Sequence, residues 1–294
     1  MKNFRPARTG ICLMIAWGAI GPAMAYTSAG DRSFPATILL PQIAPSDEFY
    51  ATAITQPIQG GARQTSYTAV YDKSITDRFG LFLTESYGVL DQKPGPNATG
   101  WQNTVLGAQY TAVIDRDSEF LLAVGVEREF GGSGASAVAA STGATQPAIT
   151  FGKGLGDMDI GYLRPLAISG LIGYQFSDNV SLRPGQFVIG AAVEYSFPYL
   201  ESKVEALDLP DVIRGLTPIV EFTLNVPSGG PGGPQVAFVA PGIASTGAGW
   251  DFGIEATVPA TRAAGSGVGV AIQLHLSLDY LLADSIGRPL FDFD

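Results

Sequence analysis

The sequence contains very little cysteine and histidine. Its 294 residues include one cysteine, Cys12, and one histidine, His275. A disulfide within the chain needs paired cysteines, and a multi-histidine metal centre needs several histidines, so the sequence excludes both. A carboxylate-only site for a hard cation stays open, although no calcium-loop spacing is present. We therefore expect no cofactor and no metal site.

Positive charge is also scarce. The chain has 17 Lys+Arg against 27 Asp+Glu, a net charge of −10. Because nucleic-acid-binding proteins use basic patches to hold phosphates, we expect no nucleic-acid partner. Charged residues make up only 15% of the chain, against roughly 25% in a typical soluble domain. The mean hydropathy is +0.20, yet no apolar run long enough for a transmembrane helix follows Ala25.

The first 25 residues have the pattern of a secretory signal peptide. Three basic residues precede an uncharged run over 11–20: Lys2, Arg5 and Arg8. The run is too short to span a bilayer as a helix, and Ala23-Met24-Ala25 supplies a small-x-small cleavage signature. We predict a cleaved signal peptide over 1–25, with a retained anchor helix as the alternative. Residues 26–46 are then an N-terminal lead-in segment, placed in the lumen of the fold or in the periplasm.

Alternation of apolar and polar residues is what the sequence has in abundance. Over 267–281 one face carries Ile272, Leu274, Leu276, Leu278 and Tyr280, and the other carries Gln273, His275, Ser277 and Asp279. Successive side chains of a strand point to opposite faces. One face would therefore lie in an apolar medium and the other in water, as in a membrane barrel or in any half-buried antiparallel strand.

Twelve segments of this kind occur. They cover about 48–57, 64–75, 78–90, 101–114, 119–130, 147–153, 164–176, 186–197, 216–226, 235–244, 249–258 and 267–281. A tilted transmembrane strand needs about 9–11 residues, and most of the segments meet that length. Together with the export signal, they predict an all-β fold over 47–294. We expect a transmembrane antiparallel up-and-down β-barrel of about 12 strands in the bacterial outer membrane, with lipid as a partner.

Three features fit this pattern poorly. Arg128 falls on the apolar face of its segment, which is tolerable if its side chain reaches the lipid headgroups. Glu85 shares a face with Leu81 and Leu83, and either a bulge or a wrong assignment would explain it. The connection over 198–215 is long although it falls on the periplasmic side. It contains either a short interfacial or plug-like helix or a miscounted strand.

Polar residues on the inner face are the candidate functional residues. The predicted lumen-lining set is Glu127, Glu129, Glu194, Glu221, Asp251, Glu255, His275 and Asp279. These acids either form a structural network with Arg164 or Arg183, or make a water-filled lumen favour cations. His275 and Ser277 would lie about 6.6 Å apart along one strand, too far for a nucleophile and its base. We expect no catalytic residue and no enzyme activity.

Five stretches carry a family resemblance: 151–157, 163–170, 218–222, 267–279 and 287–291. Together they resemble the bacterial outer-membrane barrel family labelled as the MetA-pathway of phenol degradation, often called transporter-like. The resemblance spans most of the chain after the signal peptide. It implies a channel or transporter for small-molecule solutes, aromatic or apolar ones among them. A closed structural or interaction barrel without transport activity is the alternative, and the oligomeric state stays open.

Overall fold

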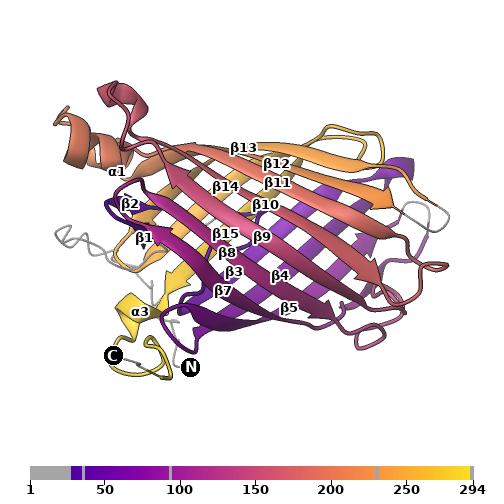
Figure 1. Cartoon of the computed structure of the whole chain (residues 1–294). Helices are drawn as coiled ribbons and strands as arrows, with labels where there is room; N and C mark the ends of the chain where they lie inside the picture. Colours follow the sequence, from indigo (N-terminus) through magenta and orange to yellow (C-terminus); the bar gives the residue numbers. More distant parts are fainter. Residues whose placement is uncertain (1–27, 35–36, 93–94, 229–231, 292–294) are drawn as a thin grey trace, which may run out of the picture.

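The computed structural model describes residues 28–34, 37–92, 95–228 and 232–291, and the predicted signal peptide lies outside them. One antiparallel sheet closes on itself as a barrel (Figure 1). Its strands are β3 (Glu48–Pro57), β4 (Arg63–Ser74), β5 (Phe79–Asp91), β6 (Ala98–Trp101), β7 (Val105–Asp115), β8 (Phe120–Glu129), β9 (Ala144–Gly154), β10 (Leu166–Ser177), β11 (Gly185–Tyr195), β12 (Leu216–Ser228), β13 (Val236–Gly247), β14 (Trp250–Pro259) and β15 (Gly269–Ser277).

The ring closes where β15 pairs with β3, so the first and last strands of the sheet are neighbours. Strands β6 and β7 both pair with β5, one after the other, and therefore share one position. All strand pairs are antiparallel, and all except β15 with β3 and β5 with β7 join strands that are consecutive in the sequence. The predicted closed antiparallel barrel of twelve positions is confirmed.

The two faces of the wall differ in chemistry. In β14, Phe252 and Ile254 are each 43% exposed, whereas Asp251 and Glu255 are each only 2% exposed. The apolar side chains therefore point away from the barrel, and the acids point into its bore. Closing the ring also pairs every wall strand except the short β6 with a neighbour on each side, which satisfies the backbone of a β-structure surrounded by lipid.

Several predicted strand boundaries are wrong: the segment 101–114 is divided into β6 and β7, and two further differences have identifiable causes. Strand β9 is longer than the predicted 147–153, because Pro147 is accommodated within a continuous register against β8. Strand β15 ends at Ser277 rather than at 281. There the chain turns into the short helix α3 (Leu278–Leu281), and the N–H of Leu278 donates to the carbonyl of Asp47 at 2.8 Å.

Of the two explanations offered for Glu85, a bulge or a wrong assignment, the bulge is absent. Strand β5 pairs with β4 in an unbroken register on both sides of Glu85, so this carboxylate does share the outer face with Leu81 and Leu83. The irregularity is in the neighbouring strand, which is interrupted between Trp101 and Val105. Thr104 lies in that interruption, and its hydroxyl donates to Glu85 at 2.8 Å.

The short elements gather at one end of the barrel, here called the terminal end (Figure 1). They are β1 (Ser28–Ala29), β2 (Arg32–Ser33), α1 (Phe197–Tyr199) and α3. The opposite end is called the loop end. The connection over 198–215 contains α1, η3 (Leu200–Val204) and α2 (Asp211–Arg214). It therefore holds short helices, and the alternative of a miscounted strand is wrong. Within the described ranges, no helix is both long and apolar enough to cross a membrane.

Candidate functional site

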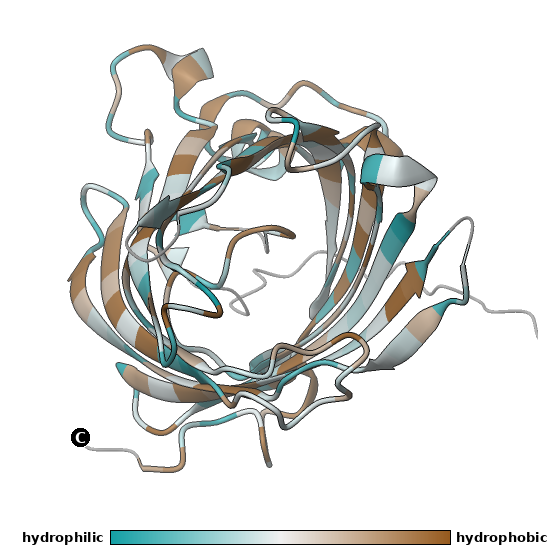
Figure 2. Ribbon diagram, turned by 90° about the vertical axis from the view of Figure 1, so that its right-hand side faces the viewer, coloured by the Kyte–Doolittle hydropathy of each residue, from teal (hydrophilic) through white to brown (hydrophobic). Residues whose placement is uncertain are grey.

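A stretch of chain lies inside the barrel. It comprises residues 28–34 and 37–46, here called the inner segment, and Figure 2 shows chain inside the ring of strands. Gln273 on β15 donates to the carbonyl of Thr37 at 3.1 Å. On other strands of the wall, Gln109 and Thr150 donate to the carbonyl of Ile43 at 3.1 and 2.8 Å. Polar wall side chains thus satisfy backbone groups that are removed from water.

Glu221 holds the middle of the inner segment. Its carboxylate, which is fully buried on β12, accepts hydrogen bonds from three consecutive N–H groups. They belong to Ile38, Leu39 and Leu40, at 2.6, 2.9 and 3.1 Å. Converging backbone N–H groups form an anion-binding nest, and hydrogen bonds to a charged acceptor are stronger than neutral ones. Glu221 is therefore a clamp on the backbone of the inner segment.

Apolar packing accompanies this clamp. Leu40 packs in a small buried cluster with Ala192 and Ile219. A Cβ atom at Gly190 would lie 2.2 Å from a methyl carbon of Leu40. The wall is therefore shaped to accept the Leu40 side chain at this position.

His275 is the centre of a second buried cluster. Its Nδ1 lies 3.0 Å from Asp251 and its Nε2 lies 3.2 Å from Glu48, and the ring stacks on Tyr50 with 4.6 Å between centroids. Tyr50 and Gln42 of the inner segment both donate to the same Glu48 carboxylate. An imidazolium ion carries protons on both nitrogens and so satisfies both carboxylates at once.

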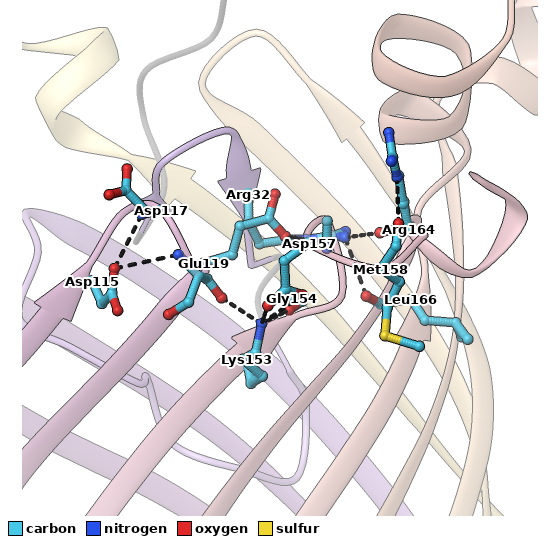
Figure 3. Close-up of polar contacts among 12 residues, drawn as sticks. Arg32, Asp115, Asp117, Glu119, Lys153, Gly154, Asp157, Met158, Arg164 and Leu166 are labelled. Carbon is cyan, nitrogen blue, oxygen red and sulfur yellow. Dashed lines mark hydrogen bonds and ion pairs between the residues drawn. The ribbon is translucent and has the colours of Figure 1, made fainter. Parts of the chain in front are cut away.

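Arg32 anchors the inner segment at the terminal end (Figure 3). Its Nε lies 3.3 Å from Glu119. Its two terminal nitrogens donate to the carbonyls of Arg164, Pro165 and Leu166 where β10 begins. The guanidinium also lies 4.1 Å from the centre of the Tyr199 ring, a cation–π contact.

Glu119 links this anchor to two further elements. It accepts hydrogen bonds from the N–H of Gly156 at 3.0 Å and from the hydroxyl of Tyr199 at 2.8 Å. Burial and the contact with Glu119 raise the pKa of Tyr199 to about 12, because both disfavour the phenolate. The anchor therefore joins the inner segment, the start of β8 and helix α1.

A cavity of about 240 Å³ lies in the bore beside the inner segment. Its apolar lining includes Ile54, Val70, Phe82 and Leu171, and its polar lining includes Asp72, Gln109, Glu127 and Gln273. Pockets for drug-sized ligands start at about 300 Å³. This cavity is therefore of a size to hold a small solute.

The predicted lumen-lining residues fall in four places. Five of them are buried on the inner face of their strands: Glu194, Glu221, Asp251, Glu255 and His275. Glu127 lines the cavity, and Glu129 accepts a hydrogen bond from Arg183 at 2.5 Å. Asp279 lies in α3, beyond the last strand. Burial and the negative charge of Glu48 raise the pKa of Asp279 to about 6. Arg164, the other predicted cation, donates from Nε to the carbonyl of Met158 at 2.7 Å.

Sequence reasoning missed five residues of these clusters: Arg32, Glu48, Tyr50, Asp72 and Glu119. The spacing of Glu48 and Tyr50 by two positions was a usable signal, because it places both on one face of a strand. Arg32 and Glu119 lie outside the predicted alternating segments or at their edge, where no periodicity assigns a direction. Within the described parts of the chain, no group of three or more His, Cys, Asp or Glu residues is arranged to hold a metal ion.

Comparison with known proteins gives the fold. No protein family and no curated protein matches the sequence. The COG4313 outer membrane channel from Pseudomonas putida F1 is similar in structure, with a TM-score of 0.57 and 11% identity over 83% of this chain and 99% of that chain. The KdgM porin (TM-score 0.46, 11% identity, 78% and 98% covered) and LpxR from Salmonella typhimurium (TM-score 0.47, 9% identity, 78% and 99% covered) are also similar. The first similarity shows an outer-membrane barrel fold, and the phenol-degradation family label stays a prediction.

Proposed function

We propose that this chain is a bacterial outer-membrane channel for small solutes, aromatic or apolar ones among them, and that it is not an enzyme. The observation that carries the proposal is a closed barrel whose outer face is apolar and whose bore contains a cavity beside the inner segment. An apolar outer face suits lipid, and a polar bore suits water and solute. The similar Pseudomonas structure is itself described as an outer membrane channel.

The inner segment sets the size of solute that this channel would pass. It occupies part of the bore and is held by wall residues on several strands. The space left beside it is the cavity of about 240 Å³. We therefore expect slow passage of small solutes and exclusion of large ones, unless the inner segment moves.

Flux through reconstituted protein tests this proposal. Liposomes containing the purified chain would be placed in isosmotic arabinose or L-phenylalanine, since a lipid bilayer retains both of these solutes. Swelling faster than that of empty liposomes is expected with both, and swelling in a large dextran is not. An equal rate with and without protein would contradict the channel and favour a closed structural barrel.

Localisation needs its own measurement. Export with cleavage after Ala25 predicts that the protein fractionates with outer membranes and begins at Tyr26. N-terminal sequencing of the protein from that fraction checks both points. A chain that retains 1–25, or that stays in the inner membrane, would contradict the predicted export route.

A further inference from the structure

Three residues that line the cavity lie in one row across neighbouring strands, together with one glycine of the barrel wall. Asp72 on β4 is opposite Phe82 on β5, Phe82 is opposite Gly107 on β7, and Gly107 is opposite Glu127 on β8. Strands lie about 4.8 Å apart, so the row extends about 14 Å along the wall. Asp72, Phe82 and Glu127 all line the cavity. An aromatic ring thus lies between two carboxyl groups.

The position of the Phe82 ring in this row depends on the absence of a side chain at Gly107. A Cβ atom at Gly107 would lie 2.0 Å from Cζ of Phe82 and within 2.5 Å of both of its Cε atoms. The outer edge of the Phe82 ring therefore occupies the place that any other side chain at 107 would take. The glycine lets the ring lie along the wall and leaves the cavity open beside it.

The two carboxyl groups of the row lack a basic partner among the described residues and also line the cavity. Other acids either have a basic partner, as Glu119 has Arg32, Asp47 has Lys73 and Glu129 has Arg183, or do not line the cavity, as is the case for Glu194, Glu221 and Glu255. In the described residues, by contrast, no lysine or arginine forms an ion pair with Asp72 or Glu127, although Asp72 is only 9% exposed. A buried carboxylate without a counter-ion is costly. A cation bound in the cavity would offset that cost.

We propose that this cavity binds a small organic cation, an ammonium group on an apolar body, a proposal that rests on the channel function and names its preferred solute class. The ammonium lies near Phe82, between Asp72 and Glu127, where carboxylates and an aromatic ring all attract a positive charge. The apolar body contacts Val70 and Leu171, which line the same cavity. Anions of the same size are repelled by the acids of the bore.

Calorimetric titration of the full chain in detergent tests the site. The probes are benzyltrimethylammonium and benzenesulfonate, which have similar bodies and opposite charges, with empty micelles as the blank. Saturable binding is expected for the cation and not for the anion. Asp72→Asn and Glu127→Gln should each weaken binding of the cation about tenfold, because each removes one charged contact. Gly107→Ala should weaken it too, because the new methyl group displaces the Phe82 ring.

Asp178→Asn is the matched control. Asp178 is an exposed carboxylate at the loop end that pairs with Arg128 at 2.5 Å and does not line the cavity. Its loss should leave the affinity unchanged, and circular dichroism should show the same β-structure in all variants. Equal affinity of wild type and Asp72→Asn, or equal binding of both probes, would overturn the site.

The outcome is separable from that of the channel proposal. If arabinose swelling occurs but the cation does not bind, the site is refuted and the channel stands. If the cation binds with the expected loss in the variants but no solute crosses, the site stands and the channel is refuted.

Discussion

The Arg32 guanidinium and the Glu119 carboxylate lie 3.3 Å apart, with side chains that are 0% and 6% exposed. Removing one partner of a buried ion pair costs about 3–5 kcal/mol, because the other charge is left without compensation. We therefore expect Arg32→Met to destabilise the folded barrel by about this amount. The measurement is the free energy of unfolding in urea, followed by tryptophan fluorescence in detergent.

A second ion pair of the inner segment provides the control for Arg32. Lys203 and Asp31 lie 2.7 Å apart, but both side chains are largely exposed. Exposed pairs contribute about 0–1 kcal/mol, so Lys203→Met should change the free energy of unfolding very little. Equal effects of the two substitutions would show that burial of the Arg32 pair is not what stabilises the terminal end.

Glu221→Gln should loosen the middle of the inner segment. The substitution keeps the size of the side chain but removes the charge that three N–H groups share. If the substitution lowers the stabilisation of the inner segment by about 1.5 kcal/mol, amide hydrogen exchange at 38–40 should become about tenfold faster. Conductance in planar bilayers should also rise, because the inner segment occupies part of the bore. Glu205→Gln, at an exposed carboxylate of the terminal end, should leave both unchanged. Unaltered exchange at 38–40 in Glu221→Gln would refute the clamp.

Gly190 and Leu40 should be energetically coupled. Gly190→Ala places a methyl group 2.2 Å from Leu40, and overpacking of this kind costs about 1–3 kcal/mol. In a Leu40→Ala background the same substitution has room, so its cost should fall towards zero. A double-mutant cycle on the free energy of unfolding checks this coupling. Additive effects would mean that Leu40 does not pack against this part of the wall.

The pKa of Asp279, raised to about 6 against its usual 3.8, predicts a pH dependence of stability. The folded protein binds this proton more tightly than the unfolded chain, so stability falls as pH rises from about 3.8 to about 6. Asp279→Asn removes this pH dependence, so the stability of the variant relative to the wild type should increase as pH rises from about 3.8 to about 6. Urea midpoints at pH 4, 5, 6 and 7 provide the comparison.

Asp178 should contribute a pH dependence of stability with the opposite sign to that of Asp279. Its hydrogen bonds to Arg128 lower its pKa, so its contribution to stability is present above about pH 3.8 and is lost as pH falls below that value. The Asp178→Asn variant should therefore be slightly less stable than the wild type at neutral pH and equally stable in acid. A gain at neutral pH would contradict the assigned pairing with Arg128.

The barrel was predictable from the sequence because one local rule, alternation with period two, repeats in every wall strand. The rule fails where another interaction overrides it. Ser277 ends its strand because the N–H of the next residue, Leu278, donates to the carbonyl of Asp47. Asp47 is distant in the sequence, so this contact cannot be predicted from nearby residues. Pro147 made β9 look short, although its neighbours keep the register.

The site was predictable only as a list of inward-facing acids. Their partners come from closure of the ring and from the inner segment, which have no periodic signature. Glu48 and His275 meet because β3 pairs with β15. The nest around Glu221 is made of backbone N–H groups, which every sequence contains. The row at Gly107 depends on register across four strands, which sequence periodicity leaves undetermined.

The contact of β3 with β15 closes the barrel and also completes the charge cluster around His275. Asp251 on β14 faces His275 on the adjacent strand β15, so these two side chains can meet before the barrel closes. Glu48 lies on β3 and reaches the imidazole only when β15 pairs with β3. An open sheet would therefore have an acid on one edge and the imidazole on the other, and attraction between them favours the closed cylinder.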